Sequence, residues 1–372
     1  MSFDHVAAAQ AVAAVAGEHA TRVDETAAFP SHTVDAAREH GLLGLLSSTD
    51  VGGHGLGPRQ AAEVIETIAQ QCASSAMVLT MHYSGTAVIE AHGGDEVRRA
   101  IAAGDHLSTL AFSESGSRSH FWAPTSTAKQ DGDSVFLDAR KSWVTSASHA
   151  TAYVWSSGPI GEGVSSIWLV PADSEGLSVS GGFDGLGLRG NDSCPVAATG
   201  VRVPASASLG GDGKGFDVMM GNVLPLFNLL ISAGSVGIAG AAVTASAEHA
   251  SGARYAHIDS ALRDFPTIRA YLAKMSVKVA SARGLLLDTL TAMETGRADT
   301  MLRVLQCKAG CGDMAIEVTD TAMRVCGGAA FRKDVGVERR FRDARAAAVM
   351  APTSDQLYDF VGKALTGMEL FA

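Results

Sequence analysis

The chain has 372 residues and is 47% hydrophobic, so it can bury a sizeable core and is long enough for two or three domains. Its formal net charge of −10 argues against a nucleic-acid-binding protein, whose binding face would be basic. Residues 1–5 lack a basic segment before an apolar core, and no run of 18 or more apolar residues stands out. We therefore expect a soluble, cytoplasmic protein without a membrane span. The five cysteines are scattered and odd in number, which indicates neither a disulfide framework nor a metal site.

The first region, residues 1–108, is expected to be helical. Apolar residues recur at three- and four-residue spacing from residue 7 to residue 102, among many Ala, Glu, Gln and Arg residues. Breaks fall at Pro30 and in a glycine-rich loop at residues 47–58. That loop has neither the Gly-Lys-Ser/Thr ending nor the preceding strand of a phosphate-binding loop, so we interpret it as a turn.

The middle region, residues 109–212, changes to short alternating runs separated by turn residues, which predicts an antiparallel β domain. The segment Ser113-Glu-Ser-Gly-Ser-Arg-Ser119 follows a short apolar strand, and its small residues allow backbone N–H groups and hydroxyls to approach a ligand closely. Trp143 and Thr145 lie two apart on a later strand and are expected to share one face. An aromatic wall beside a hydroxyl suits a flat heterocycle.

The last region, residues 213–372, predicts helices that are separated by breaks near Gly252, Gly296, Gly327 and Pro352. Long, Ala-rich helices in this number indicate a four-helix bundle. Apolar faces left exposed on such a bundle would serve contacts between subunits, so we expect a homodimer or homotetramer.

Several of these segments together resemble one family. Phe112-Ser-Glu-Ser-Gly-Ser-Arg-Ser119 and Trp143-Val-Thr145 are similar to the flavin seat of the acyl-CoA dehydrogenases, which has Thr-Glu-Pro-x-x-Gly-Ser and Trp-(Ile/Val)-Thr. Residues 187–193, the Gly-Gly pair at 327–328 and Phe341-Arg-Asp-Ala344 follow at the family's spacing. The resemblance implies an α+β fold with an N-terminal helical domain, a middle antiparallel β domain and a C-terminal four-helix bundle. It also implies an FAD-dependent oxidoreductase.

The resemblance further implies which residues bind FAD. The strand threonine of the family bonds near flavin N5 and the tryptophan packs by the ring, while an Arg and a Gln-x-x-Gly-Gly segment reach the cofactor of a neighbouring subunit. Arg324 replaces that Gln, and Arg can bind a pyrophosphate with two hydrogen bonds. The positions carried over as cofactor-binding are Phe112, Ser113, Ser119, Trp143, Thr145, Arg254, Arg324, Gly327, Gly328 and Thr353.

The proton-abstracting carboxylate of the family is missing from this sequence. Ala351 stands where the family has its catalytic Glu, and residues 224–231, the alternative seat, contain neither Glu nor Arg. Asp355, one helical turn after Ala351, is a candidate for a displaced base, although a capping or surface role suits it equally. His82 is a candidate general acid or base, because the corresponding helix in relatives faces the cavity; a histidine satisfied in a packing face is the alternative.

Three functions remain open at this point. The first is an FAD-dependent dehydrogenase that acts on an acyl thioester or related small molecule without the usual Glu base. The second is a flavin-dependent monooxygenase or oxidase on the same fold, since oxygen chemistry needs no carboxylate at position 351. The third is a non-catalytic binding module. The expected partners are a small-molecule or acyl-thioester substrate and either an electron-transfer flavoprotein or a flavin reductase.

Overall fold

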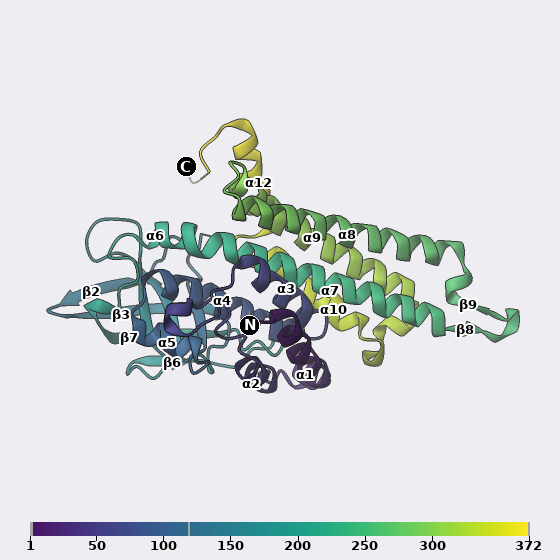
Figure 1. Ribbon diagram of the computed structural model, residues 1–372, viewed down its shortest axis with the longest axis horizontal. Helices are drawn as coiled ribbons and strands as arrows, with labels where there is room; N and C mark the ends of the chain where they lie inside the picture. The colour runs from purple at the N-terminus through teal and green to yellow at the C-terminus, as the bar shows by residue number, and fades with distance from the viewer. Residues whose placement is uncertain (1–2, 118–119, 371–372) are drawn as a thin grey trace.

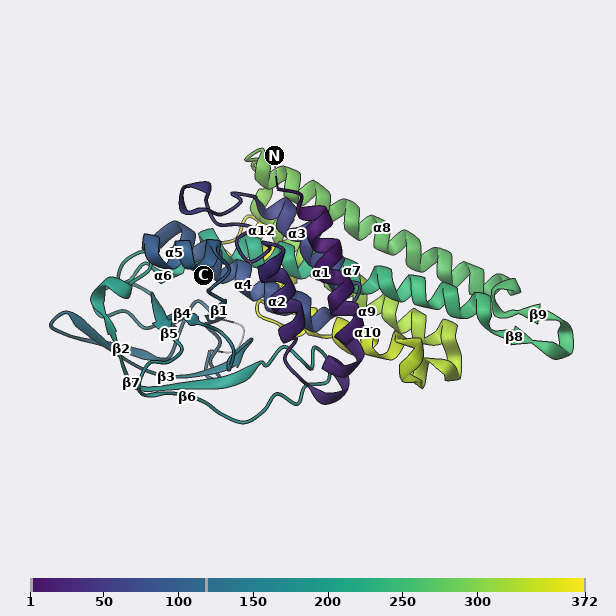
Figure 2. The ribbon, with the colours of Figure 1, turned by 60° about the horizontal axis from the view of Figure 1, so that its bottom comes forward.

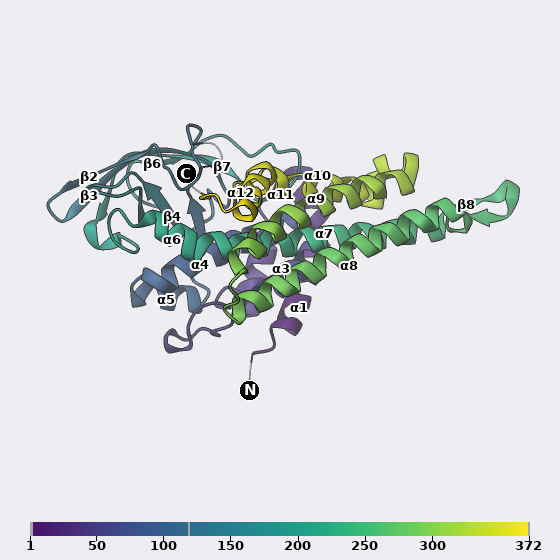
Figure 3. The same cartoon turned by 90° about the horizontal axis from the view of Figure 1, so that it is seen from above.

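The computed structural model describes residues 3–117 and 120–370. It places helices first, then two β-sheets, then a second and longer set of helices, which confirms the expected order of structure along the chain (Figure 1). The sheets lie at one end of an elongated molecule, and the tip of the long helices lies at the other end (Figure 3).

The helix α4 is buried on nearly all sides, between the other N-terminal helices, the sheets and the C-terminal helices. This explains why most residues of α4 are apolar or small and why the helix has no polar stripe. The helix α3 begins at Pro58, and the Gln60 side chain accepts a hydrogen bond from the Gly57 amide at 3.0 Å, which caps its first turn. Figure 2 shows α1 close to both α2 and α3, and it packs against both. The helices are α1 (His5–Thr26), α2 (Ser31–Glu39), α3 (Pro58–Ala69), α4 (Ala73–His92) and α5 (Asp95–Ala102).

The strands form two sheets with their own core, in which Trp155 pairs across the strands with Trp168 and both are buried. The sheet orders are β1-β4-β5 and β2-β3-β7-β6. The expectation of purely antiparallel strands needs one correction, because β1 pairs with β4 in parallel. The β2–β3 hairpin separates these two strands in sequence and leaves room for the crossover. The strands are β1 (Ser108–Ala111), β2 (Thr127–Asp131), β3 (Ser134–Val144), β4 (Ala152–Ser157), β5 (Ser166–Pro171), β6 (Leu177–Val179) and β7 (Cys194–Pro204).

The C-terminal helices form a bundle in which α9 packs against α7, α8 and α12. A short hairpin, β8 with β9, joins α7 to α8 at the end of the molecule farthest from the sheets (Figure 3). The elements are α6 (Gly215–Val218), α7 (Leu224–Gly252), β8 (Arg254–Tyr255), β9 (Ser260–Ala261), α8 (Pro266–Glu294), α9 (Thr300–Cys326), α10 (Val337–Ala344), α11 (Ala346–Val349) and α12 (Ser354–Thr366).

One helical segment of this bundle is as long and as apolar as a membrane-spanning helix, although we expected no such segment from the sequence. Residues 215–252 are long and apolar enough to cross a bilayer, yet 78% of the most apolar window is buried inside the protein. Its apolar character is that of a core helix, since α7 contacts α3, α4, α8 and α9.

Candidate functional site

A cavity opens where β1, β3, α4 and α7 meet. Its volume, including the open mouth, is about 470 Å³. We call it the site cavity. Among the flavin residues expected from the sequence, Phe112, Ser113 and Trp143 line it together with Ala351. The other lining residues are Met81, Leu110, Phe121, Ser142, Val223, Leu224 and Phe227.

Trp143 and Thr145 do not share a face, which corrects the expectation drawn from strand alternation. A β-bulge between Lys141 and Val144 interrupts the pairing of β3 with β7, and Trp143 has a left-handed φ of 59°. As a result the indole is 68% exposed at the cavity, whereas Thr145 is only 3% exposed. The Thr145 hydroxyl lies 3.1 Å from the hydroxyl of Ser193.

A buried ion pair supports this corner of the cavity. The Lys141 ammonium donates to Glu114 at 2.6 Å, and the two side chains are 0% and 3% exposed. The second Glu114 oxygen accepts from the amide of Thr125 at 2.6 Å and from the amide of Ser126 at 3.1 Å. Glu114 therefore ties together both ends of the loop between β1 and β2. This loop contains Ser119, which lies outside the described residues.

Lys141 was not among the site residues predicted from the sequence, although its strand position indicates a buried lysine. Lys141 has the same strand parity as Val135, Leu137 and Ala139, the inward positions of β3. A lysine on the inward face of a strand requires a buried partner. Burial lowers the pKa of Lys141 to about 8, and the neighbouring Glu114 carboxylate opposes that shift.

The site cavity has no carboxylate in the position that the resemblance assigns to the base. Ala351 lines it, and Ser113 and Ser142 contribute the only hydroxyl side chains among the lining residues that the structure describes. Asp355, proposed as a displaced base, is exposed in the first turn of α12 and does not line the cavity, so the geometry argues against that role. Thr353 is the N-cap of α12 and accepts from the Gln356 amide at 3.3 Å.

His82 is a structural histidine in this geometry, which corrects its candidacy as an acid or base. The ring is 0% exposed; Nε2 donates to the Leu43 carbonyl at 2.8 Å, and Nδ1 accepts from the Ser108 amide at 3.1 Å. Both nitrogens are therefore occupied. Burial lowers the pKa of His82 to about 4, so the ring is neutral near pH 7.

A second buried lysine supports the chain around Ala351. The Lys308 ammonium on α9 donates to the carbonyl oxygens of Ala347, Met350 and Pro352 at 3.2, 3.0 and 2.6 Å. Burial lowers the pKa of Lys308 to about 7, and the three carbonyl acceptors favour the charged form against that effect. Lys308 therefore fixes the backbone that presents Ala351 to the cavity. It lies one turn after Val304 on the buried stripe of α9.

The remaining cofactor candidates lie away from the site cavity and do not line it. Arg254 is exposed on β8, and Arg324 is exposed near the end of α9, where its guanidinium donates to the Tyr271 hydroxyl at 3.1 Å. Gly327 caps α9 with a left-handed φ of 56°, and Gly328 follows it on the surface. One chain therefore does not bring these four residues to the lining of the site cavity.

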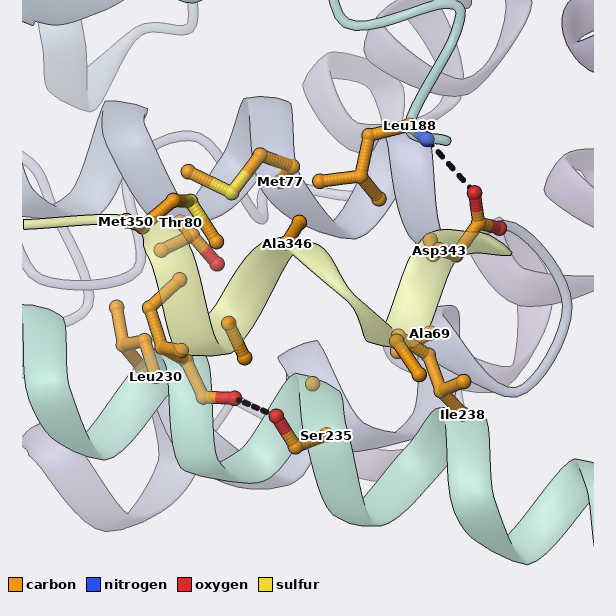
Figure 4. Close-up of a pocket in the computed structure, with 15 residues that line it drawn as sticks. Ala69, Met77, Thr80, Leu188, Leu230, Ser235, Ile238, Asp343, Ala346 and Met350 are labelled. Atoms are coloured by element: carbon orange, nitrogen blue, oxygen red, sulfur yellow. Dashed lines mark hydrogen bonds between the residues drawn. The ribbon is translucent and has the colours of Figure 1, made fainter. Parts of the chain in front are cut away.

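A second cavity of about 370 Å³ adjoins the first. Figure 4 shows side chains of α7, such as Leu230 and Ser235, on one side of it and Thr80 of α4 on another, with Met350 close by. The two cavities are neighbours because Met350 lines this one and the next residue, Ala351, lines the site cavity. We call this second space the inner cavity.

Comparison with known proteins gives consistent results over the whole chain. Three family models of the acyl-CoA dehydrogenases match: the N-terminal domain at residues 5–104, the middle domain at residues 109–201 and the C-terminal domain at residues 213–366. The probable acyl-CoA dehydrogenase YngJ of Bacillus subtilis is 28% identical over 346 residues, which cover 91% of this chain and 90% of YngJ.

Solved structures share the fold at lower identity. Butyryl-CoA dehydrogenase from Megasphaera elsdenii has a TM-score of 0.91 and 21% identity, and the match covers 98% of this chain and 97% of that one. FMN-bound TdsC from Paenibacillus sp. A11-2 has a TM-score of 0.89 and 23% identity, with coverage of 98% and 97%. The order of the three domain matches and the shared fold lead to one conclusion: this chain belongs to the acyl-CoA dehydrogenase family and is a flavin-dependent oxidoreductase.

Proposed function

We propose that the chain binds FAD with the isoalloxazine ring against Trp143 in the site cavity, and that it oxidises an acyl thioester or related small molecule without a carboxylate base. The observation that carries the proposal is the lining of this cavity. An indole that is 68% exposed at its mouth offers a flat ring a stacking surface, while Ala351 stands at the position of the base.

Each part of the lining has a defined role in this proposal. Trp143 packs on the cofactor ring, and the Ser113 hydroxyl is available to its polar edge. Phe112, Phe121 and Phe227 make the rest of the wall apolar and exclude water from the reacting atoms. FAD, when bound, supplies the acceptor for a hydride. The Ala351 methyl group cannot accept a proton, so the chain's own contribution to proton removal is small.

A second candidate function follows from the same lining. Oxygen-dependent chemistry at a reduced flavin does not require a carboxylate beside the substrate, and the described lining of the site cavity contains no Asp, Glu or His. A flavin-dependent monooxygenase or oxidase therefore also fits the cavity. In that case the electron partner would be a flavin reductase rather than an electron-transfer flavoprotein.

Cofactor binding from two subunits also belongs to the proposal. Arg254, Arg324, Gly327 and Gly328 are exposed, so all four are accessible to a neighbouring molecule. Exposed apolar side chains, among them Val277 and Leu287 on α8, provide a surface for subunit contacts. We propose a cytoplasmic homodimer or homotetramer in which these residues reach the FAD of the neighbour.

The test begins with the absorbance spectrum of the purified protein and identification of the flavin released on denaturation. Anaerobic mixing with butyryl-CoA then measures flavin bleaching. We expect bound FAD and bleaching that is slower by about 10²–10⁴-fold than in a relative with the Glu, the usual contribution of a positioned base. Complete inertness combined with rapid oxygen consumption by the reduced flavin would favour the monooxygenase. A colourless protein that ignores added FAD would exclude both functions.

A further inference from the structure

Aromatic side chains are concentrated in the lining of the site cavity. They make up 6% of the chain but four of the eleven described lining residues, namely Phe112, Phe121, Trp143 and Phe227. The described lining of the inner cavity contains none. Aliphatic side chains would exclude water equally well, so an apolar wall by itself does not require these rings. Their concentration in one cavity therefore indicates a ligand that makes use of aromatic surface.

The flavin of the proposed function accounts for only part of this surface. A flat ring that packs on Trp143 presents one face to the indole, which comes from β3. The other three rings come from other elements: Phe112 directly follows β1, Phe121 lies in the loop after it, and Phe227 is on α7. These three side chains are 5–9% exposed and line the cavity. They can therefore contact a second ligand, the substrate.

Packing holds the Phe121 ring in a fixed orientation. It lies edge-to-face against Trp122, with the ring centroids 5.2 Å apart, and the Trp122 ring lies 6.0 Å from that of Phe360 on α12. The Phe112 and Phe121 rings are nearly parallel, with an interplanar angle of 7° and centroids 6.4 Å apart. One orientation of a flat ligand ring therefore suits both side chains. A flexible aliphatic chain would gain nothing from this arrangement.

The rest of the lining limits the substituents on such a ring. The described lining of the site cavity contains no Asp, Glu, His, Lys or Arg, so a charged substituent there would be buried without an opposite charge. Met81 of α4 contributes a thioether, which makes favourable contacts with aromatic rings. The Ser142 hydroxyl is available to a carbonyl or hydroxyl group beside the ring.

We propose that the site cavity selects substrates that carry a planar, uncharged aromatic ring, and that Phe121 is a specificity-determining residue. The proposal rests on the proposed function, because it places the substrate in the cavity that holds the flavin. It narrows the substrate class to aryl-bearing thioesters or related aryl compounds, in preference to plain aliphatic acyl chains.

The test compares two thioesters that differ only in the ring, 3-phenylpropanoyl-CoA and 3-cyclohexylpropanoyl-CoA. Their binding is measured by calorimetric titration of the full, flavin-loaded chain, with the flavin reduced beforehand and oxygen excluded so that neither compound is turned over. The cyclohexyl ring is of similar size and at least as apolar, so hydrophobic burial alone would not favour the phenyl compound. We expect the phenyl compound to bind about tenfold more tightly, the effect of two aromatic contacts. Equal binding, tighter binding of the cyclohexyl compound, or binding of neither overturns the proposal.

Variants then assign the preference to the cavity rings. Phe121→Leu removes one ring and keeps the wall apolar, so we expect the preference to fall to about threefold or less. Phe227→Leu, on a separate element, should act in the same way and serves as the test if Phe121→Leu does not fold. Phe136→Leu is the matched control, because Phe136 lies on β3 outside the cavity lining, and it should keep the preference. An undiminished preference in the cavity variants would overturn the assignment.

The flavin spectrum separates failure of this proposal from failure of the proposed function. A colourless wild type would refute the flavin site, and this inference with it. An intact flavin spectrum and bleaching by butyryl-CoA, combined with equal binding of the two ring-bearing thioesters, would refute only the selection of aromatic rings.

Discussion

Replacing Lys141 by Met tests whether the buried ion pair supports the flavin site. Met keeps most of the lysine stem but leaves the Glu114 carboxylate, 3% exposed, without its cation. Breaking a buried pair by removing one partner costs about 3–5 kcal/mol. We expect a loss of this size in the free energy of unfolding. We also expect weaker flavin retention, because Trp143 follows Lys141 by two residues and the Ser142 amide donates to the Ser113 carbonyl at 2.9 Å.

Denaturant unfolding and the flavin-to-protein absorbance ratio measure these two effects. Lys278→Met is the matched control, since its pair with Glu317 has side chains that are 43% and 59% exposed and should contribute only about 0–1 kcal/mol. The double variant Glu114→Gln/Lys141→Met should regain part of the loss, because Gln carries no charge. The deficit of Lys141→Met should shrink as the pH falls, because protonation neutralises the unpaired Glu114. A loss below about 1 kcal/mol, or one independent of pH, would refute the reasoning.

Three further predictions concern the base, the buried histidine and the second subunit. Ala351→Glu should accelerate anaerobic flavin bleaching by butyryl-CoA by about 10²-fold or more; unchanged bleaching would show that proton removal does not limit the reaction. Because the pKa of His82 falls from 6.5 unfolded to about 4 folded, the unfolded chain binds the extra proton between these values, and stability declines as the pH falls through that window. His82→Gln should flatten this decline when melting is followed from pH 7 to pH 4, and an equally steep curve would contradict the assignment. Arg324→Met, which keeps apolar contact with Tyr271, should weaken FAD binding about tenfold with little change in melting temperature; unchanged affinity would place Arg324 away from the cofactor.

The order of helical, β and helical regions followed from local patterns and is confirmed. The helical spacing of apolar residues, and the alternation of apolar and polar residues between turns, depend only on neighbours in the sequence. Both patterns can therefore be recognised without the tertiary structure. The family resemblance likewise rested on residues that follow one another along the chain at the family's spacing, among them Trp143, Gly327 and Gly328. The domain boundaries at residues 108 and 212 and the cofactor roles of individual residues remain predictions.

Tertiary structure decided the orientation of the side chains within that frame. Alternation failed at Trp143 because a bulge, which depends on the pairing of β3 with β7, turns the backbone there. His82 and Asp355 were chosen as acid–base candidates from their residue types and positions in the sequence. The hydrogen-bond partners of His82 and the exposure of Asp355 depend on how the chain packs. Lys141 and Lys308 could have been suspected from their inward positions, but not their partners.

The sequence by itself determined that a methyl group stands at position 351, since the identity of a side chain needs no coordinates. Only the tertiary structure placed that methyl group in the same cavity as Trp143. The physical reason is that local periodicity assigns residues to the faces of each helix or strand, whereas the meeting of two faces depends on packing between segments more than a hundred residues apart.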